Sequence, residues 1–393
     1  MMQGADELRV SPASETGRHR EGAGGLDLER SSFRARMTDH LPVAVGTTLG
    51  LFFVSDGVLD GPYFKGHRVP AFLQVGLRYY AATVDPVGEP ALFVSDDDGE
   101  TWGVSTATTL TFPDDVDAVL GRVCQLQLDL SIPPSPGAQP VLAGVDPAAL
   151  FRSSDGITFE LVRGLWDLPD RAGWEPPGDR LHTVLTHADR PGRITVAIGS
   201  GGIYRSDDGG ETWLAKNGGI AMHPADDWRG PRRQIYKLAM DAAEPDSLFA
   251  QTDTGTYHSE NGGDSWRRVS GAGEPDGLPT DFGFAVVCHV VEPNTAYVFP
   301  LESEWYPCSP EGRPRVYRTT DSGGRWVMLG DGLPSEHAHT TVVSDAFAIG
   351  HTSPYPLVFG TRAGQLFASL DRGQSWRLVS SGLPPVLCVR VLD

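Results

Sequence analysis

The chain has little that would tie it to a membrane or to an oxidising compartment. Its 393 residues include no run of about 18 apolar residues, and the N-terminus lacks the apolar segment of a secretory signal. There are four cysteines and no CxxC pair. Cys124, Cys288 and Cys388 lie in apolar runs typical of a buried core, whereas Cys308 lies in a loop. We therefore expect a cytoplasmic protein that does not act at a membrane.

Positive charge is also scarce. The chain has 32 Lys and Arg against 51 Asp and Glu, a net charge of −19. This balance excludes a nucleic acid as the expected partner, because a polyanion would be repelled over most of the surface. No phosphate-binding loop, dinucleotide fingerprint, nucleophile elbow or pair of zinc ligands is present, so we predict no cofactor and no metal. We expect a monomer.

A repeated motif, Ser-x-Asp-x-Gly-x-Thr-Trp, is the strongest signal in the sequence. Copies of it, two of them looser and one shortened, begin at positions 95, 153, 206, 259, 319 and 369, so the intervals are 50 to 60 residues. A self-similar unit of this length predicts a repeat architecture. The Asp accepts hydrogen bonds from nearby amides, the Gly supplies a positive φ, and the Trp packs between units. Each copy is thus expected to be a tight turn between two strands.

Each repeat divides into four short strands, A to D, bounded by Gly, Pro or Asp. The seven A strands are expected to begin near Val69, Arg122, Leu181, Gln234, Phe284, Thr340 and Val386. The last of them has no strands after it, and residues 41–57 hold strands that lack an A strand. The two fragments together predict an all-β, seven-bladed propeller over residues 41–393, closed by both chain ends.

Residues 1–40 are polar, rich in Gly, Ser, Glu and Arg, and without periodicity, which predicts a disordered tail. Met37 as the true start of the protein is an equally good interpretation.

The repeats resemble those of the Asp-box (BNR-repeat) β-propeller superfamily, which includes sialidases, xyloglucanases and photosystem II assembly factors. The runs SGGIYRSDDGGETW, LPTDFGFAV and FGTRAGQLFAS are most similar to intracellular bacterial proteins described as sialidase-like or glycosyl-hydrolase-like. The resemblance covers residues 40–393 and implies a propeller whose Asp boxes are scaffold. For a sialidase it would also imply an Arg-Ile-Pro motif, which Arg68-Val69-Pro70 imitates, and two more arginines that we do not place.

Alternating strand direction puts the D–A and B–C loops on one face and the Asp boxes on the other. Three long insertions, 164–180, 218–233 and 300–315, fall on the first face, and they carry Trp and Tyr among charges. Such loops bind ligands, or else their Trp residues only pack the loops down.

Polar residues at the starts of the A strands should surround the mouth of the central channel. We predict Glu302, Asp281 and His182 as catalytic residues, with either carboxylate as acid or base and His182 as the proton partner. The predicted substrate-binding residues are Arg68, Lys237, Tyr236, His67, Trp305 and His337.

Two functions remain open. The first is an enzyme that acts on a small polar or carbohydrate-like metabolite by acid–base chemistry, and we favour it because polar groups concentrate at the channel mouth. The second is a non-catalytic binding or assembly scaffold. A true exo-sialidase is a third and less favoured alternative.

Overall fold

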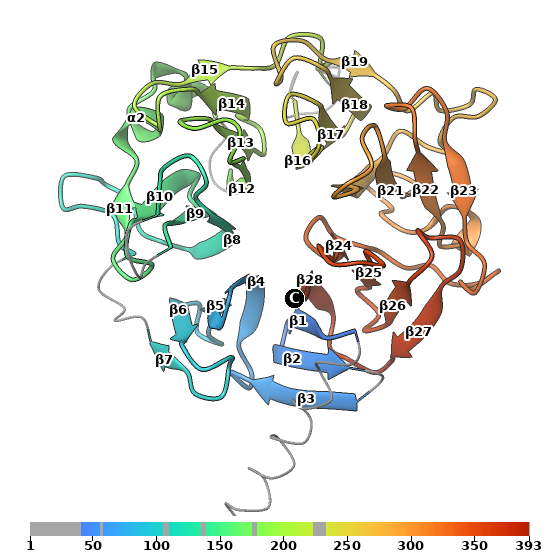
Figure 1. The fold of residues 1–393 in the computed structure, drawn as a ribbon, viewed down its shortest axis with the longest axis horizontal. Helices are drawn as coiled ribbons and strands as arrows, with labels where there is room; N and C mark the ends of the chain where they lie inside the picture. Colours follow the sequence, from blue (N-terminus) through green and yellow to red (C-terminus); the bar gives the residue numbers. More distant parts are fainter. Residues whose placement is uncertain are drawn as a thin grey trace, which may run out of the picture. The chain divides into compact units, whose positions relative to one another are not determined.

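The computed structural model describes residues 41–55, 58–104, 110–134, 139–174, 179–222 and 233–392. Residues 1–40, for which the sequence predicts a disordered tail, lie outside this description. The described residues form seven four-stranded antiparallel sheets arranged in a ring (Figure 1). The chain is therefore a seven-bladed β-propeller, as its repeats predict.

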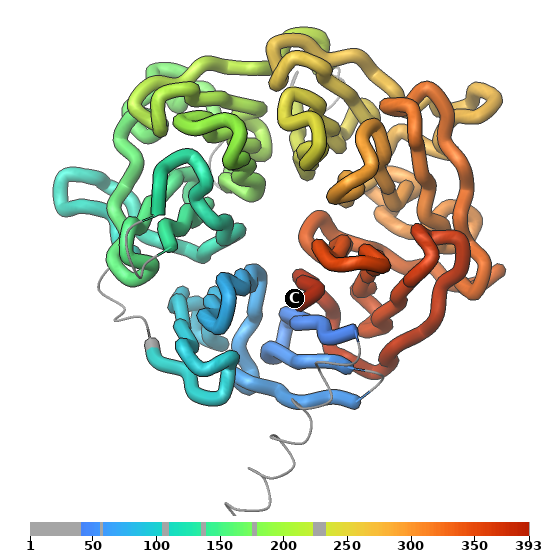
Figure 2. The backbone as a smooth tube through the Cα atoms, viewed as in Figure 1, coloured from blue at the N-terminus to red at the C-terminus, as the bar shows by residue number. Residues whose placement is uncertain are grey.

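The blades follow the sequence once around the ring (Figure 2), and we number them in that order. Blade 1 contains β28 (Val386–Val391), β1 (Val43–Thr47), β2 (Gly50–Ser55) and β3 (Val58–Tyr63). Blades 2 to 4 contain, from the channel outward, β4 (Arg68–Val75), β5 (Arg78–Val84), β6 (Pro90–Ser95) and β7 (Gly103–Val104); β8 (Arg122–Leu128), β9 (Val141–Asp146), β10 (Ala149–Ser153) and β11 (Glu160–Leu161); and β12 (Leu181–Leu185), β13 (Ile194–Ile198), β14 (Gly202–Ser206) and β15 (Leu214–Ala215).

Blades 5 to 7 contain β16 (Ile235–Met240), β17 (Leu248–Thr252), β18 (Gly255–Ser259) and β19 (Arg267–Arg268); β20 (Gly283–Cys288), β21 (Ala296–Pro300), β22 (Val316–Thr319) and β23 (Val327–Leu329); and β24 (Phe347–Ile349), β25 (Leu357–Gly360), β26 (Leu366–Ser369) and β27 (Arg377–Ser380). The helical elements described are short: α2 (Arg163–Trp166) and the 3-10 turns η1 (Pro169–Gly173) and η2 (Pro310–Gly312). None of the described helices has the length and apolar character needed to cross a bilayer.

The closing blade joins the two ends of the propeller. β28 is the innermost strand of blade 1 and pairs antiparallel with β1, with Val43 opposite Val391 and Val45 opposite Val389. Val45 and Val389 are fully buried. The strand from the C-terminal end thus closes the ring against the first described strand, as predicted.

The repeated motif forms the expected turn, and the copy that begins at Ser206 shows its chemistry. Ser206 Oγ donates to Asp208 Oδ1 at 2.7 Å and accepts from the amide of Gly210 at 2.8 Å. Asp208 also accepts from the amide and the hydroxyl of Thr212, four residues further on. These hydrogen bonds, from Thr212 first, lower the pKa of Asp208 to about 2. Gly210 has φ 98°, which glycine adopts without strain.

In two of the repeats the tryptophan that follows the turn links neighbouring blades, whereas the indole N–H of Trp213 donates to Gly210 within its own turn. Trp266 is buried, and its indole N–H donates to the carbonyl of Lys216 in the preceding blade at 2.8 Å. Trp326 makes the equivalent bond to Val269 at 2.7 Å. These two indoles therefore contribute both buried area and a satisfied hydrogen bond to the contact between blades.

One predicted strand is wrong in position. The other six A strands begin within one residue of the prediction, but in blade 7 the innermost strand β24 starts at Phe347 rather than near Thr340. The carbonyl of Thr340 accepts from the amide of Ser309, and that of Thr341 accepts from the amide of Arg362. Because these backbone groups bond to loops instead of to a strand, the segment before β24 stays irregular and continues into the channel.

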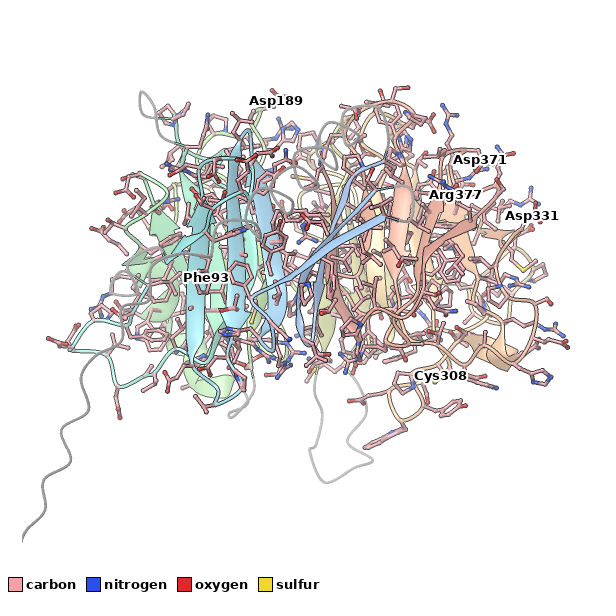
Figure 3. The ribbon with its side chains drawn as sticks, turned by 90° about the horizontal axis from the view of Figure 1, so that it is seen from below. Phe93, Asp189, Cys308, Asp331, Asp371 and Arg377 are labelled. Atoms are coloured by element: carbon pink, nitrogen blue, oxygen red, sulfur yellow. The ribbon has the colours of Figure 1, made fainter. Side chains whose placement is uncertain are left out.

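The two ends of the ring differ as the strand directions predict. Figure 3 places Asp371, in the turn of the last copy of the repeated motif, and Asp189, in the loop from β12 to β13, at one end, and Cys308, in the loop from β21 to β22, at the other. The loops that enter the innermost strands share the end that carries Cys308.

Candidate functional site

A cavity of about 360 Å³ lies at the start of the innermost strands, and residues from six of the seven sheets and the loops beside them line it. Its lining residues are Arg68, Pro70, Arg122, Cys124, Arg180, His182, Gln234, Ile235, Tyr236, Phe284, Val343, Ser344, Asp345, Arg362 and Leu387. The innermost strand of each blade begins here, so residues far apart in the sequence converge.

Four arginines make this cavity strongly cationic. Arg68 begins β4, Arg122 begins β8, Arg180 precedes β12, and Arg362 lies between β25 and β26. Arg122 pairs with a carboxylate, Asp146, at 3.0 Å. The other three are exposed side chains and have no carboxylate within ion-pair distance among the described residues.

One carboxylate, Asp345, is among the lining residues, and two cations hold it. Lys237 Nζ lies 2.9 Å and Arg390 Nη2 lies 3.1 Å from the same oxygen, Oδ1. Lys237 and Asp345 are nearly buried, with side chains 11% and 12% exposed. Burial opposes ionisation of Asp345, but Lys237 and Arg390 outweigh it and hold the pKa of the carboxyl below its usual value. Asp345 is therefore an anion, placed at the boundary between the cavity and the channel.

His182 lines the cavity, but both of its ring nitrogens are occupied by the protein. Nε2 lies 2.8 Å from the carbonyl oxygen of Ile235, and Nδ1 lies 3.0 Å from the hydroxyl of Thr183. Burial, followed by the positive charges of Arg180 and Lys237, lowers the pKa of His182 to about 3. The ring is neutral at pH 7, donates from Nε2 to the carbonyl and accepts from the hydroxyl. It ties β12 to β16.

The part of the wall formed by blades 5 and 6 is aromatic. Tyr236 and Phe284 both line the cavity and are half-buried. Their rings meet edge-to-face at 5.0 Å, and each also packs against the buried Phe282. This cluster fixes the two rings at the cavity wall.

The predicted catalytic residues do not come together. Asp281 lies before β20, where its carboxylate pairs with Arg268 and accepts from the hydroxyl of Ser270. Glu302 follows β21, and its Oε1 accepts from the amide of Glu311 at 3.1 Å. Neither carboxylate lines the cavity.

The predicted binding residues divide between the cavity and the surrounding loops. Arg68 and Tyr236 line the cavity, and Lys237 contacts it through Asp345. His67, in the turn before β4, and His337, an exposed residue with φ 55°, do not line it. Trp305, in the loop after β21, does not line it either.

The sequence left open whether the tryptophans of the inserted loops are exposed for binding or pack the loops against the propeller, and the described loops contain both kinds. In the first, the guanidinium carbon of Arg171 lies 3.5 Å from the ring centre of Trp166, and Trp174 donates to the hydroxyl of Tyr204 at 3.2 Å. These tryptophans pack their loop down. In the third, Trp305 is 75% exposed. Most of the second insertion, residues 223–232 with Trp228, lies outside the described residues.

Several site residues escaped the sequence analysis. Arg122 and Arg362 lie at a strand start and in a short hairpin loop, which are ordinary places for solvated arginines. Asp345 lay within the wrongly placed A strand. Arg390 offered a signal, because a charge inside the apolar run VLCVRV of an innermost strand has to face the channel.

Comparisons with known proteins agree on the architecture. No family model matches the chain, and no curated protein matches it. Among solved structures, a GH74 xyloglucanase from Xanthomonas campestris is similar with a TM-score of 0.59 and 18% identity, over 88% of this chain and 53% of that one. The chain thus spans about half the length of that enzyme.

Two other solved structures match over nearly their whole length. A protein from Lactobacillus plantarum has a TM-score of 0.54 and 13% identity, over 90% of this chain and 100% of that one. A protein from Bacteroides fragilis, provisionally assigned as a 6-phosphogluconolactonase, has a TM-score of 0.54 and 11% identity, over 90% and 98%. At these identities the likeness shows the β-propeller fold alone.

Proposed function

We propose that this protein binds a small anionic metabolite in the central cavity. The observation that carries the proposal is the set of arginines Arg68, Arg180 and Arg362, which converge on one cavity without carboxylate partners among the described residues. The chain as a whole carries a net charge of −19, so this local excess of positive charge is not a property of the general surface. Guanidinium groups bind carboxylate and phosphate through paired hydrogen bonds.

Acid–base catalysis has less support from the geometry than binding has. The nitrogens of His182 are engaged with the protein, and Asp345 is held by two cations. Glycoside hydrolysis generally requires two carboxyl groups that flank the scissile bond, and among the described residues Asp345 is the one carboxylate in the cavity lining. A sialidase-like or other hydrolytic activity at this site is therefore less well supported than binding of an anion.

A sugar acid or a phosphorylated sugar is the first type of ligand to test. Such compounds combine an anionic group for the arginines with hydroxyls for Gln234, Ser344 and Asp345, which also line the cavity. The names of two similar structures, a xyloglucanase and a provisional 6-phosphogluconolactonase, point to sugar chemistry in proteins with this fold. We also propose that the repeats are Asp boxes and that the protein acts in the cytoplasm. A cytoplasmic location is consistent with a metabolite as the ligand.

Calorimetric titration with inorganic phosphate, citrate and 6-phosphogluconate at low ionic strength tests the proposal. At least one anion should bind, and Arg68→Gln or Arg180→Gln should weaken binding by about tenfold or more, since a charged hydrogen bond contributes about 1.5–3 kcal/mol. Arg325→Gln is the matched control, because Arg325 follows an Asp-box turn at the opposite end of the ring and pairs with Asp276. The proposal fails if no anion binds, or if the control weakens binding as much as the cavity variants do.

A scaffold that binds another macromolecule is the second candidate function, and the exposed loop after β21 favours it. Trp305 and Tyr306 are 75% and 50% exposed, and Tyr306 contacts His339 through its hydroxyl at 3.2 Å. Large exposed aromatic side chains are enriched at protein interfaces. Under this alternative, Trp305→Ser would abolish capture of a partner and leave anion binding unchanged.

A further inference from the structure

The cavity wall is divided between charge and aromatic rings. Arg68, Arg122 and Arg180 lie at the starts of the innermost strands of blades 2, 3 and 4, which are consecutive around the ring. Tyr236 and Phe284 lie on the innermost strands of blades 5 and 6, which follow directly. A ligand in this cavity therefore has three guanidinium groups along one arc and two aromatic rings along the next, with Arg362 and Asp345 of blade 7 beyond the rings.

The aromatic arc is a surface that a ligand can use. Phe284 has no polar atom, yet it is half-buried rather than buried and lines a cavity. Its position is fixed from behind by Phe282, whose ring centre lies 5.1 Å away. A preformed ring of this kind gains contact area with a flat ligand at little cost in side-chain entropy.

From this division we infer that the natural ligand carries its anionic group on a ring, and that this ring rests against Tyr236 and Phe284 while the anion faces the arginines. The chemical class is a phosphorylated or carboxylated cyclic compound, either a sugar or an aromatic one. The inference rests on the proposed anion binding and narrows it, because a simple anion would use the arginines and leave the aromatic arc uncovered.

Titrations of the full chain with inorganic phosphate, phenyl phosphate and glucose 6-phosphate test the inference. At least one of the two ring-bearing phosphates should bind about tenfold or more tightly than inorganic phosphate. Tighter binding of phenyl phosphate indicates an aromatic ligand, and tighter binding of glucose 6-phosphate indicates a sugar; either supports the inference. Equal affinity for all three probes overturns this inference and leaves the proposed function standing. Binding of none of them overturns this inference, and the proposed function falls as well if citrate and 6-phosphogluconate also fail to bind.

A pair of variants locates the effect. Phe284→Leu should lower the affinity for the ring-bearing phosphates nearly to that for inorganic phosphate. The affinity for inorganic phosphate itself should not change. Phe93→Leu is the control, because Phe93 is a half-buried ring on β6 that packs against Phe64 with ring centres 4.5 Å apart and does not line the cavity. If both variants reduce the affinity for the ring-bearing phosphates equally, or if Phe284→Leu does not reduce it, the ring of the ligand does not rest against Phe284. Should Phe284→Leu fail to fold, the comparison of probes on the unaltered chain still decides.

Discussion

Removal of the closing strand should unfold the whole propeller. Truncation after residue 385 deletes β28, which carries the fully buried Val386, Cys388 and Val389, and also the nearly buried Leu392. Burial of an aliphatic side chain contributes about 1.5–3 kcal/mol, so the three aliphatic residues alone account for roughly 5–9 kcal/mol. That is comparable with the whole unfolding free energy of a typical domain, about 5–15 kcal/mol. The deletion also exposes the edge of β1.

A single substitution tests the packing around β1 and β28 without deleting the C-terminal strand. Gly46 lies in β1, and a Cβ atom there would overlap the carbonyl oxygen of Val69 and the sulfur of Cys388. Gly46→Ala should therefore destabilise the protein by about 1–3 kcal/mol through overpacking. Gly103→Ala is the matched control, because the nearest atom to a Cβ at Gly103 is 3.8 Å away.

Soluble yield and thermal unfolding followed by circular dichroism measure both effects. We expect no soluble truncated protein, a lowered Tm for Gly46→Ala, and an unchanged or slightly raised Tm for Gly103→Ala. Deletion of residues 1–36, which the sequence predicts to be dispensable, should leave Tm unchanged. A truncated chain without β28 that still melts cooperatively within about 5 °C of the full chain would refute the reasoning, because it would show that the closing strand contributes little.

Three further predictions concern the scaffold. Ser206→Ala removes two hydrogen bonds from the turn of a repeated motif, so the unfolding free energy should fall by about 1–2 kcal/mol in a denaturant titration, with anion affinity unchanged. Asp246 accepts from both Arg190 and Arg193, so Asp246→Asn should lower Tm, by less at high salt. The folded-state pKa of His182 is about 3 against an ordinary value of 6.5, so the unfolded chain takes up a proton first as pH falls below 6.5. This group should cost about 2 kcal/mol of stability by pH 5, and His182→Gln should flatten that slope.

The scaffold was predictable because its signals are local and repeated. Ser206, Asp208 and Gly210 lie within five residues of one another, and their hydrogen bonds follow from those residue types at that spacing. The closing blade was predictable because the last repeat has only an innermost strand and the first segment lacks one. The start of β24 was not predictable, because residues near Thr340 have a strand-like composition but bond to Ser309 and Arg362, which are distant in the sequence.

The site was harder to predict because it depends on how far each strand extends into the channel. Arg68, His182 and Tyr236 line the cavity, since they lie at the starts of innermost strands. Glu302 and Asp281 also lie in loops at that end of the ring, but their carboxylates bond to their own surroundings, away from the channel. Sequence periodicity gives the face of a strand, and it does not give the direction of a side chain in a loop.

Ion pairs with carboxylates distinguish the arginines that stabilise the fold from those that we assign to ligand binding. Arg152 holds the buried Asp129 at 2.8 Å, and Arg205 and Arg193 share the carboxylate of Asp207. Such pairs connect strands and loops, and their positive charges are compensated.

The arginines of the cavity have the opposite property. Arg68, Arg180 and Arg362 line one cavity without a described carboxylate partner, and like charges that face one cavity repel, which lowers rather than raises the stability of the folded chain. A fold gains nothing from such an arrangement unless an anion compensates it. For this reason we attribute the cavity arginines to ligand binding, and expect that changing one of them to Gln alters anion affinity far more than it alters Tm.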